Sequence, residues 1–134
     1  MKVVIYTNIY ISFLIGKILK NLIDDVISND IEILTSIEQE KEIFDVVNRD
    51  KFKKYFGNAE KIELFYLLEN TCKKIDIRKK VDDCIDKKDN FLLDIAINGK
   101  ADYIISGDGH LLKMNPYGKI KIITYSEFKK NFIK

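Results

Sequence analysis

Short apolar runs alternate with helical stretches along the whole chain, and this alternation constrains the fold more than any other feature of the sequence. Strands are predicted at 2–6, 31–34, 74–77, 103–106 and 120–124. Helices are predicted at 9–15, 18–27, 36–48, 58–73, 90–98 and 125–132. Strands separated by helices form right-handed crossovers. The sequence therefore predicts an α/β fold with a mostly parallel sheet that helices cover on both faces.

Local signals predict where some of the helices begin and end. Ser36 is predicted to cap helix 36–48, Asn58 to cap helix 58–73, and Gly99 to end helix 90–98. Helical spacing predicts that five side chains of helix 58–73 point inward, namely those of Ile62, Leu64, Phe65, Leu68 and Cys72.

Length and charge exclude several classes of protein. A chain of 134 residues with 46% hydrophobic residues predicts a single domain, 1–134, with one core. The formal net charge of +2 falls short of that of a DNA-coating protein, so any contact with nucleic acid is expected to be local. Two cysteines cannot build a disulfide framework, which fits a reducing cytoplasm. The apolar run 3–15 is too short to span a membrane.

The sequence lacks the common catalytic motifs but places acidic and polar residues after its predicted strands. It has no G-x-G-x-x-G, no P-loop and no G-x-S-x-G, and its single histidine, His110, is expected to be an exposed loop residue. In parallel sheets, ligand sites form beyond the carboxyl ends of the strands. Carboxylates gathered there repel one another unless a hard cation such as Mg²⁺ or Mn²⁺ holds them. This chemistry favours phosphodiester hydrolysis.

Four stretches, taken together and in this order, resemble the PIN-domain family. They are VVIYTNI (3–9), Ser36 with Glu42 on its helix, CIDKKDNFLLDIA (84–96), and ADYIISGD (101–108) followed by Leu111 and Leu112. The resemblance covers nearly the whole chain and is strongest to toxins of bacterial toxin–antitoxin modules. It implies a three-layer α/β/α domain with a central sheet of four to five strands. It also implies a homodimeric endoribonuclease that acts on RNA, depends on Mg or Mn, and is neutralised by an antitoxin protein.

The resemblance also assigns the site, with one departure from the family pattern. Glu42, Asp89 and Asp108 match the family's catalytic, metal-binding acids. Three polar residues match positions that line the site, namely Thr7, Asn8 and Ser106. The family's first acid is an Asp, and here that position is Tyr6. A phenol is neutral at pH 7, so impaired activity is expected. The alternative is a catalytically silent domain that binds RNA or a protein.

Each acidic assignment has a simpler alternative. Asp89 or Asn90 could cap the following helix, and Asp108 could be an ordinary turn residue. Glu42 could belong to a solvated helix face, because Glu40 lies nearer the apolar stripe. A second rival activity is metal-dependent hydrolysis of DNA or of a small phosphate ester.

A basic and aromatic segment follows the Glu42 helix. Arg49, Lys51, Lys53 and Lys54, with Tyr55, could bind single-stranded RNA by phosphate pairing and base stacking. The alternative is that Phe52 and Phe56 belong to the core while the lysines only increase solubility.

Overall fold

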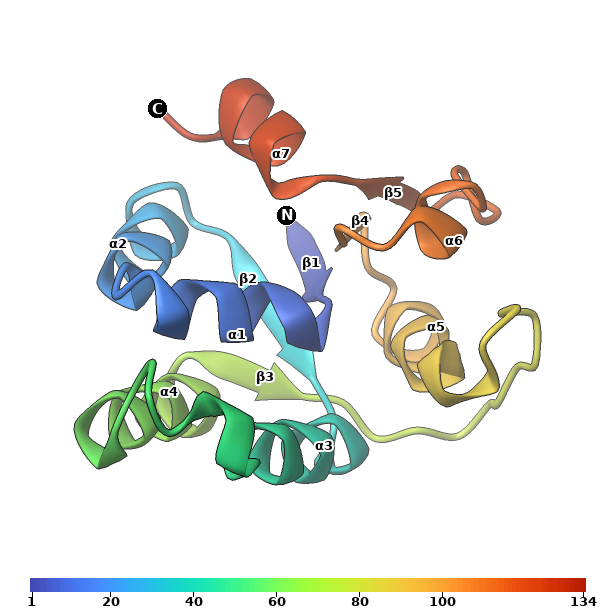
Figure 1. Ribbon diagram of the computed structural model, residues 1–134. Helices are drawn as coiled ribbons and strands as arrows, with labels where there is room; N and C mark the ends of the chain where they lie inside the picture. Colours follow the sequence, from blue (N-terminus) through green and yellow to red (C-terminus); the bar gives the residue numbers. More distant parts are fainter.

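Five short parallel strands form the centre of the molecule in the computed structural model, which describes residues 1–134 (Figure 1). The strands are β1 (Lys2–Ile5), β2 (Glu32–Thr35), β3 (Cys72–Lys74), β4 (Tyr103–Ile105) and β5 (Lys121–Ile123). Their order in the sheet is β3-β2-β1-β4-β5, and each neighbouring pair is parallel. The prediction of a mostly parallel sheet is therefore confirmed, and every strand is parallel.

Helices follow the strands in the alternation that the sequence predicts. They are α1 (Thr7–Ile15), α2 (Leu19–Ser28), α3 (Ile37–Val47), α4 (Asn58–Asn70), α5 (Asn90–Asn98), α6 (Gly109–Leu112) and α7 (Tyr125–Phe132), with short 3-10 turns η1 (Asp50–Phe52) and η2 (Lys87–Asp89). None of these helices is long and apolar enough to cross a membrane.

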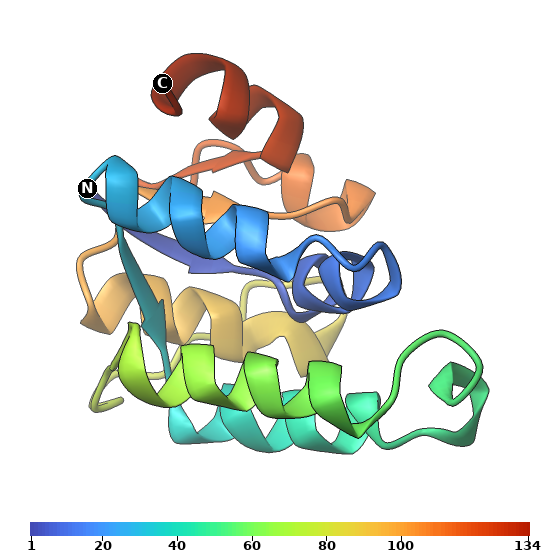
Figure 2. The same ribbon diagram turned by 90° about the vertical axis from the view of Figure 1, so that its left-hand side faces the viewer.

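The sheet separates two hydrophobic cores. Neighbouring side chains of a strand point to opposite faces, so Val3 and Ile5 pack with α1, α2, α4 and α7, whereas Val4 packs with α5 and α6. Figure 1 shows α1 and α2 on one side of the strands and α5 on the other, and Figure 2 shows the same layers from the side. The three-layer α/β/α architecture is therefore confirmed.

The third strand and the helix before it differ from the prediction. Helix α4 ends at Asn70, and β3 comprises Cys72–Lys74 rather than 74–77. Cys72 therefore belongs to an edge strand paired with Ile33, not to the inward face of the helix. Ile62 was predicted to point inward, but its side chain is 67% exposed because α4 packs through the face that carries Leu64.

Two predicted end signals act differently in the structure. Gly57 rather than Asn58 is the N-cap of α4, and its backbone N–H donates to Glu60 at 3.0 Å. Gly99 does end α5, but its φ is −92° and the left-handed residue is Lys100. A Cβ on Gly99 would lie 2.6 Å from a methyl carbon of Leu34, so close packing against β2 requires the glycine.

The strand order reverses at one point of the sheet. From β1 the chain proceeds to β2 and β3 on one side, and then returns to β4 and β5 on the other. Ligands of open α/β sheets bind where the order reverses, beyond the carboxyl ends of the strands. In this chain that point lies between β1 and β4, where Tyr6 and Ser106 follow their strands.

Candidate active site

Tyr6 lies at the point where the strand order reverses, between β1 and β4. It follows β1 directly, extends the ladder by donating its backbone N–H to the Ile105 carbonyl at 2.9 Å, and is the N-cap residue of α1. Its side chain is 9% exposed and packs in the core on the α5 side. Because the ring is held in this core, the hydroxyl group has a defined position among the acidic residues.

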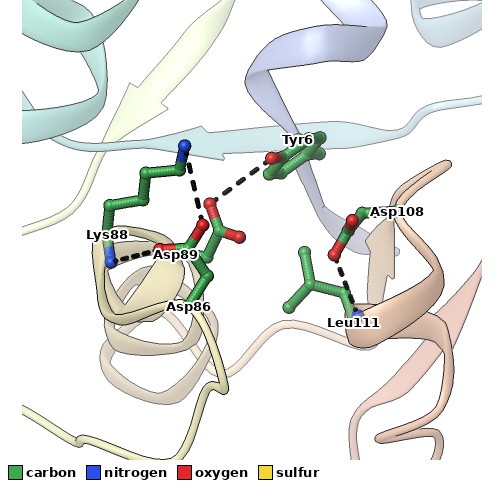
Figure 3. Close-up of polar contacts among 6 residues, drawn as sticks. All are labelled: Tyr6, Asp86, Lys88, Asp89, Asp108 and Leu111. Atoms are coloured by element: carbon green, nitrogen blue, oxygen red, sulfur yellow. Dashed lines mark hydrogen bonds and ion pairs between the residues drawn. The ribbon is translucent and has the colours of Figure 1, made fainter.

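The Tyr6 hydroxyl donates a hydrogen bond to Asp89 Oδ1 at 3.4 Å (Figure 3). Burial raises the pKa of Tyr6 well above its ordinary value, and the negative charges of Asp89, Asp108 and Glu42 raise it further. All three predicted acids therefore act on one hydroxyl group. Tyr6 is a neutral hydrogen-bond donor at any pH near neutrality.

Asp89 is a buried carboxylate that does not cap its helix. It occupies the position before α5 and is only 6% exposed, yet its side chain accepts no capping hydrogen bond. Burial raises its pKa, and the charges of Asp86 and Asp108 add to this rise. Asn90 does not cap α5 either, since its side chain binds the backbone of Cys84 and the carboxylate of Asp82. The capping alternative for these two residues is thus wrong.

Asp108 does have the local role that its sequence context suggests. Its Oδ2 accepts the backbone N–H of Leu111 at 3.1 Å and caps α6 (Figure 3). Its own backbone N–H donates to Ser106 Oγ at 2.9 Å. Ser106 is fully buried at the end of β4. Capping uses only one carboxylate oxygen, and the Asp108 charge still acts on Tyr6 and Asp89.

Glu42 approaches the same site from α3. It is half-buried, and burial raises its pKa, with a further contribution from Asp89. The Thr7 hydroxyl opposes this rise most strongly, and the positive charges of Lys88 and Arg49 add to its effect. Glu40, its competitor on the same helix, instead forms an ion pair with Lys74 at 3.3 Å. Glu42 therefore faces the acidic site, whereas Glu40 ties α3 to β3.

Gln39 is a buried residue of the site's framework that the sequence interpretation missed. Its side chain donates to the Ile5 carbonyl at 2.7 Å and accepts from Thr35 Oγ1 at 3.0 Å, and it is fully buried. Its backbone N–H donates to Ser36 Oγ, so the predicted Ser36 cap is confirmed. The only signal was the Ser-x-x-Gln pattern of a capping box. Here the amide joins α3 to the end of β1 instead.

The flanking residues take different positions. Thr7 is buried at the start of α1, whereas Asn8 is exposed. Lys88 forms an ion pair with Asp86 at 3.5 Å beside Asp89 (Figure 3). His110 is exposed, as the sequence predicts.

The acids come from separate elements, but they do not form a metal-binding cluster. No three His, Cys, Asp or Glu side chains are arranged to hold a metal ion. The donor set has the right chemistry for Mg²⁺ or Mn²⁺, which prefer carboxylate oxygens. However, the Tyr6 hydroxyl binds Asp89, and the α6 cap engages one oxygen of Asp108. The residues in this arrangement do not fit a divalent cation.

The basic segment around η1 lies at the end of α3. Arg49, Lys51, Lys53 and Lys54 are exposed, and the Lys51 and Lys54 ammonium groups each lie 5.1 Å from an aromatic ring centroid, of Phe52 and Tyr55 respectively. Lys53 is paired with Asp50 at 3.0 Å. Phe56 is buried, as expected if it belongs to the core.

Comparison with known proteins identifies the family. A search of curated proteins and a search of solved structures found no match. The family model of the PIN domain matches residues 2–110. This range includes strands β1 to β4 and the acids Glu42, Asp89 and Asp108. This span covers most of the chain and agrees with the three-layer fold. The chain belongs to the PIN-domain family, whose fold is of the nuclease type.

Proposed function

We propose that this chain is a PIN-type endoribonuclease, the toxin of a toxin–antitoxin pair, whose metal-dependent activity is impaired by Tyr6. The observation that carries the proposal is the convergence of Glu42, Asp89 and Asp108 on the Tyr6 hydroxyl. A carboxylate at this position would be a fourth anionic oxygen donor for Mg²⁺ or Mn²⁺. The phenol instead donates a hydrogen bond to Asp89 and remains neutral.

The chain's own residues have separate tasks in this proposal. Glu42, Asp89 and Asp108 supply anionic oxygens, while Gln39 and Ser106 fix the backbone that carries them. Bound at such a site, a divalent ion would supply an activated water and charge stabilisation for phosphodiester hydrolysis.

RNA is the proposed substrate because basic groups adjoin the acidic site. Arg49 and Lys88 lie close enough to lower the pKa of Glu42 against the effect of burial. The basic segment 49–54 continues from Arg49 along the surface, with lysines over aromatic rings. Such a segment can pair with phosphates and stack on unpaired bases.

The test compares Tyr6→Asp with Tyr6→Asn, which has nearly the same shape but no charge. Tyr6→Asp is expected to cleave RNA when Mg²⁺ or Mn²⁺ is added and to inhibit growth when expressed, whereas Tyr6→Asn and the unaltered chain remain inactive. Adding Asp89→Asn or Asp108→Asn to Tyr6→Asp is expected to abolish both effects. DNA and mononucleotides are assayed in parallel. Cleavage of DNA or of mononucleotides in preference to RNA would contradict the proposed substrate.

One observation favours a second candidate, a catalytically silent domain that binds RNA or a protein. The Tyr6 ring is well buried in the α5-side core and its hydroxyl has a partner, so the site is stable without a metal. If Tyr6→Asp folds but cleaves nothing, while the unaltered chain binds RNA or an antitoxin tightly, this candidate replaces the first.

We further propose that the chain is a homodimer and that it binds a cognate antitoxin. An exposed apolar surface lies on α3 and α4, where Phe44 is 56% exposed and lies 5.8 Å from Phe65 between ring centroids. Lys41 and Asp45 flank the same groove. A two-fold pairing would place each next to its opposite charge in the second copy. Light scattering is expected to give twice the chain mass, and Phe44→Glu is expected to give a monomer.

A further inference from the structure

A hollow lies at the opposite end of the sheet from the acidic residues. It runs between the C-terminal end of α5 and the turn 117–120 that precedes β5, and we call it the amino-end groove. Its volume is about 590 Å³, within the range of ligand-binding clefts. Its floor is aliphatic, formed by Ile97, Ala101 and Ile120, and its rim carries three lysines, Lys79, Lys100 and Lys119.

The three rim lysines stand on fixed backbone. The Asn98 side chain holds the backbone of Lys79 by two hydrogen bonds. The Lys79 N–H donates to Asn98 Oδ1 at 3.0 Å, and the Asn98 side-chain amide donates to the Lys79 carbonyl at 2.7 Å. Lys100 follows Gly99, the C-cap of α5, and has a left-handed backbone with φ 54°. Lys119 lies in a tight turn closed by reciprocal backbone hydrogen bonds between Tyr117 and Ile120, at 2.8 and 2.9 Å. Little backbone entropy would be lost when a ligand binds.

The charge on this rim has no partner within the chain. None of the three lysines forms an ion pair. The one lining carboxylate, Asp102, accepts the backbone N–H of Lys2 at 2.9 Å. The amino-end groove therefore combines an aliphatic floor with a net positive rim.

We propose that the amino-end groove binds an acidic peptide segment that carries aliphatic side chains. Carboxylates of such a segment would pair with the rim lysines, and its Leu or Ile side chains would cover the floor. Nucleic acid fits less well, because the floor is aliphatic and the one lining aromatic residue, Tyr117, has its hydroxyl bound to Asp83. The main chain of β5 is not the docking edge, since Asn115 occupies the Ile122 N–H at 2.8 Å.

The test uses a short fluorescein-labelled peptide of alternating Leu and Glu and measures its binding by anisotropy. The double variant Lys100→Glu, Lys119→Glu is expected to weaken binding about tenfold, because two exposed ion pairs are lost and reversed. The matched control is Lys113→Glu, Lys130→Glu, which reverses two exposed and unpaired lysines elsewhere and should leave binding unchanged. Thermal melts establish that both double variants fold.

Three further measurements separate this proposal from its rivals. A Ser and Glu peptide should bind far more weakly than the Leu and Glu peptide, and equal binding would refute the role of the aliphatic floor. An oligouridylate that binds more tightly, and loses affinity in the same double variant, would show a nucleic-acid site instead. Amide shifts that cluster away from Ile97 and Gly118 would place the peptide elsewhere and overturn the assignment. Asp89→Asn should leave peptide binding intact, so failure here is independent of the nuclease proposal.

Discussion

Replacing Tyr6 with Asp should make the stability of this domain depend on a divalent cation. The substitution removes a ring that is 9% exposed in the α5-side core and places a charge next to Asp89. Losing a buried aromatic ring costs about 3–5 kcal/mol. A domain of ordinary stability, roughly 5–15 kcal/mol, would remain folded but weakened.

A bound cation should restore much of that loss. An ion that binds only the folded state stabilises it by about 2.7 kcal/mol when its free concentration exceeds Kd about a hundredfold. The unaltered chain should gain nothing, since its acids are not arranged to hold a metal ion. Tyr6→Asn has the same cavity without the charge, so in EDTA it should be less destabilised than Tyr6→Asp, which adds repulsion from Asp89, and it should not respond to Mn²⁺.

The assay is urea unfolding followed by circular dichroism, in EDTA and in Mn²⁺, for the unaltered chain and both variants. Equal stabilisation of all three proteins by Mn²⁺ would show that Tyr6 does not control metal binding. If Tyr6→Asp folds but Mn²⁺ does not raise its free energy of unfolding, the missing carboxylate is not the reason the site lacks a metal. Either result would refute the reasoning.

Three other substitutions test separate parts of the structure. Asp89→Asn should stabilise the metal-free chain at pH 7. Burial raises the pKa of Asp89 in the folded state. The contribution of Asp89 to stability is therefore complete only below the unfolded carboxyl pKa and is lost as the pH rises through the folded pKa. The advantage of the variant in thermal melts should vanish on acidification. Gly99→Ala should cost about 1–3 kcal/mol in urea unfolding, because its Cβ would lie 2.6 Å from a leucine methyl of β2, whereas Gly107→Ala, which meets nothing within 4 Å, should be neutral. Gln39→Leu should cost about 1–3 kcal/mol by leaving the carbonyl at the end of β1 without its donor, and an unchanged unfolding midpoint would disprove that role.

The central strands were predictable from sequence because their side chains are buried on both faces. Val3, Val4 and Ile5 form an uninterrupted apolar run, as strands of a covered parallel sheet do. The edge strand β3 has the sequence Cys-Lys-Lys, so its pairing with β2 rests on backbone hydrogen bonds and leaves no apolar pattern. The apolar residues Ile75 and Ile77 follow the strand, and their apolar pattern is the reason the strand was predicted at 74–77.

The sequence predicted where in the fold the candidate site lies, but not which of its side chains contact one another. The rule that ligands bind beyond strand ends located Tyr6, Asp89 and Asp108. The contact between Tyr6 and Asp89 spans 83 positions, and nothing local to either residue indicates it. Gln39 was invisible for the same reason, since its partner at the end of β1 lies 34 positions away. Long-range polar contacts depend on how helices pack, which periodicity does not encode.

Tyr6 resolves an electrostatic conflict that the fold itself creates. The fold brings three carboxylates close to Tyr6, and burial already raises the pKa of Asp89 and Glu42. A fourth carboxylate at the end of β1 would add repulsion that only a cation could offset. A neutral phenol adds no repulsion, donates a hydrogen bond to Asp89, the most buried of the three acids, and packs its ring in the core. The same side chain that stabilises the metal-free fold is, in the proposed nuclease, the one that stands where a catalytic cation would need an anionic oxygen.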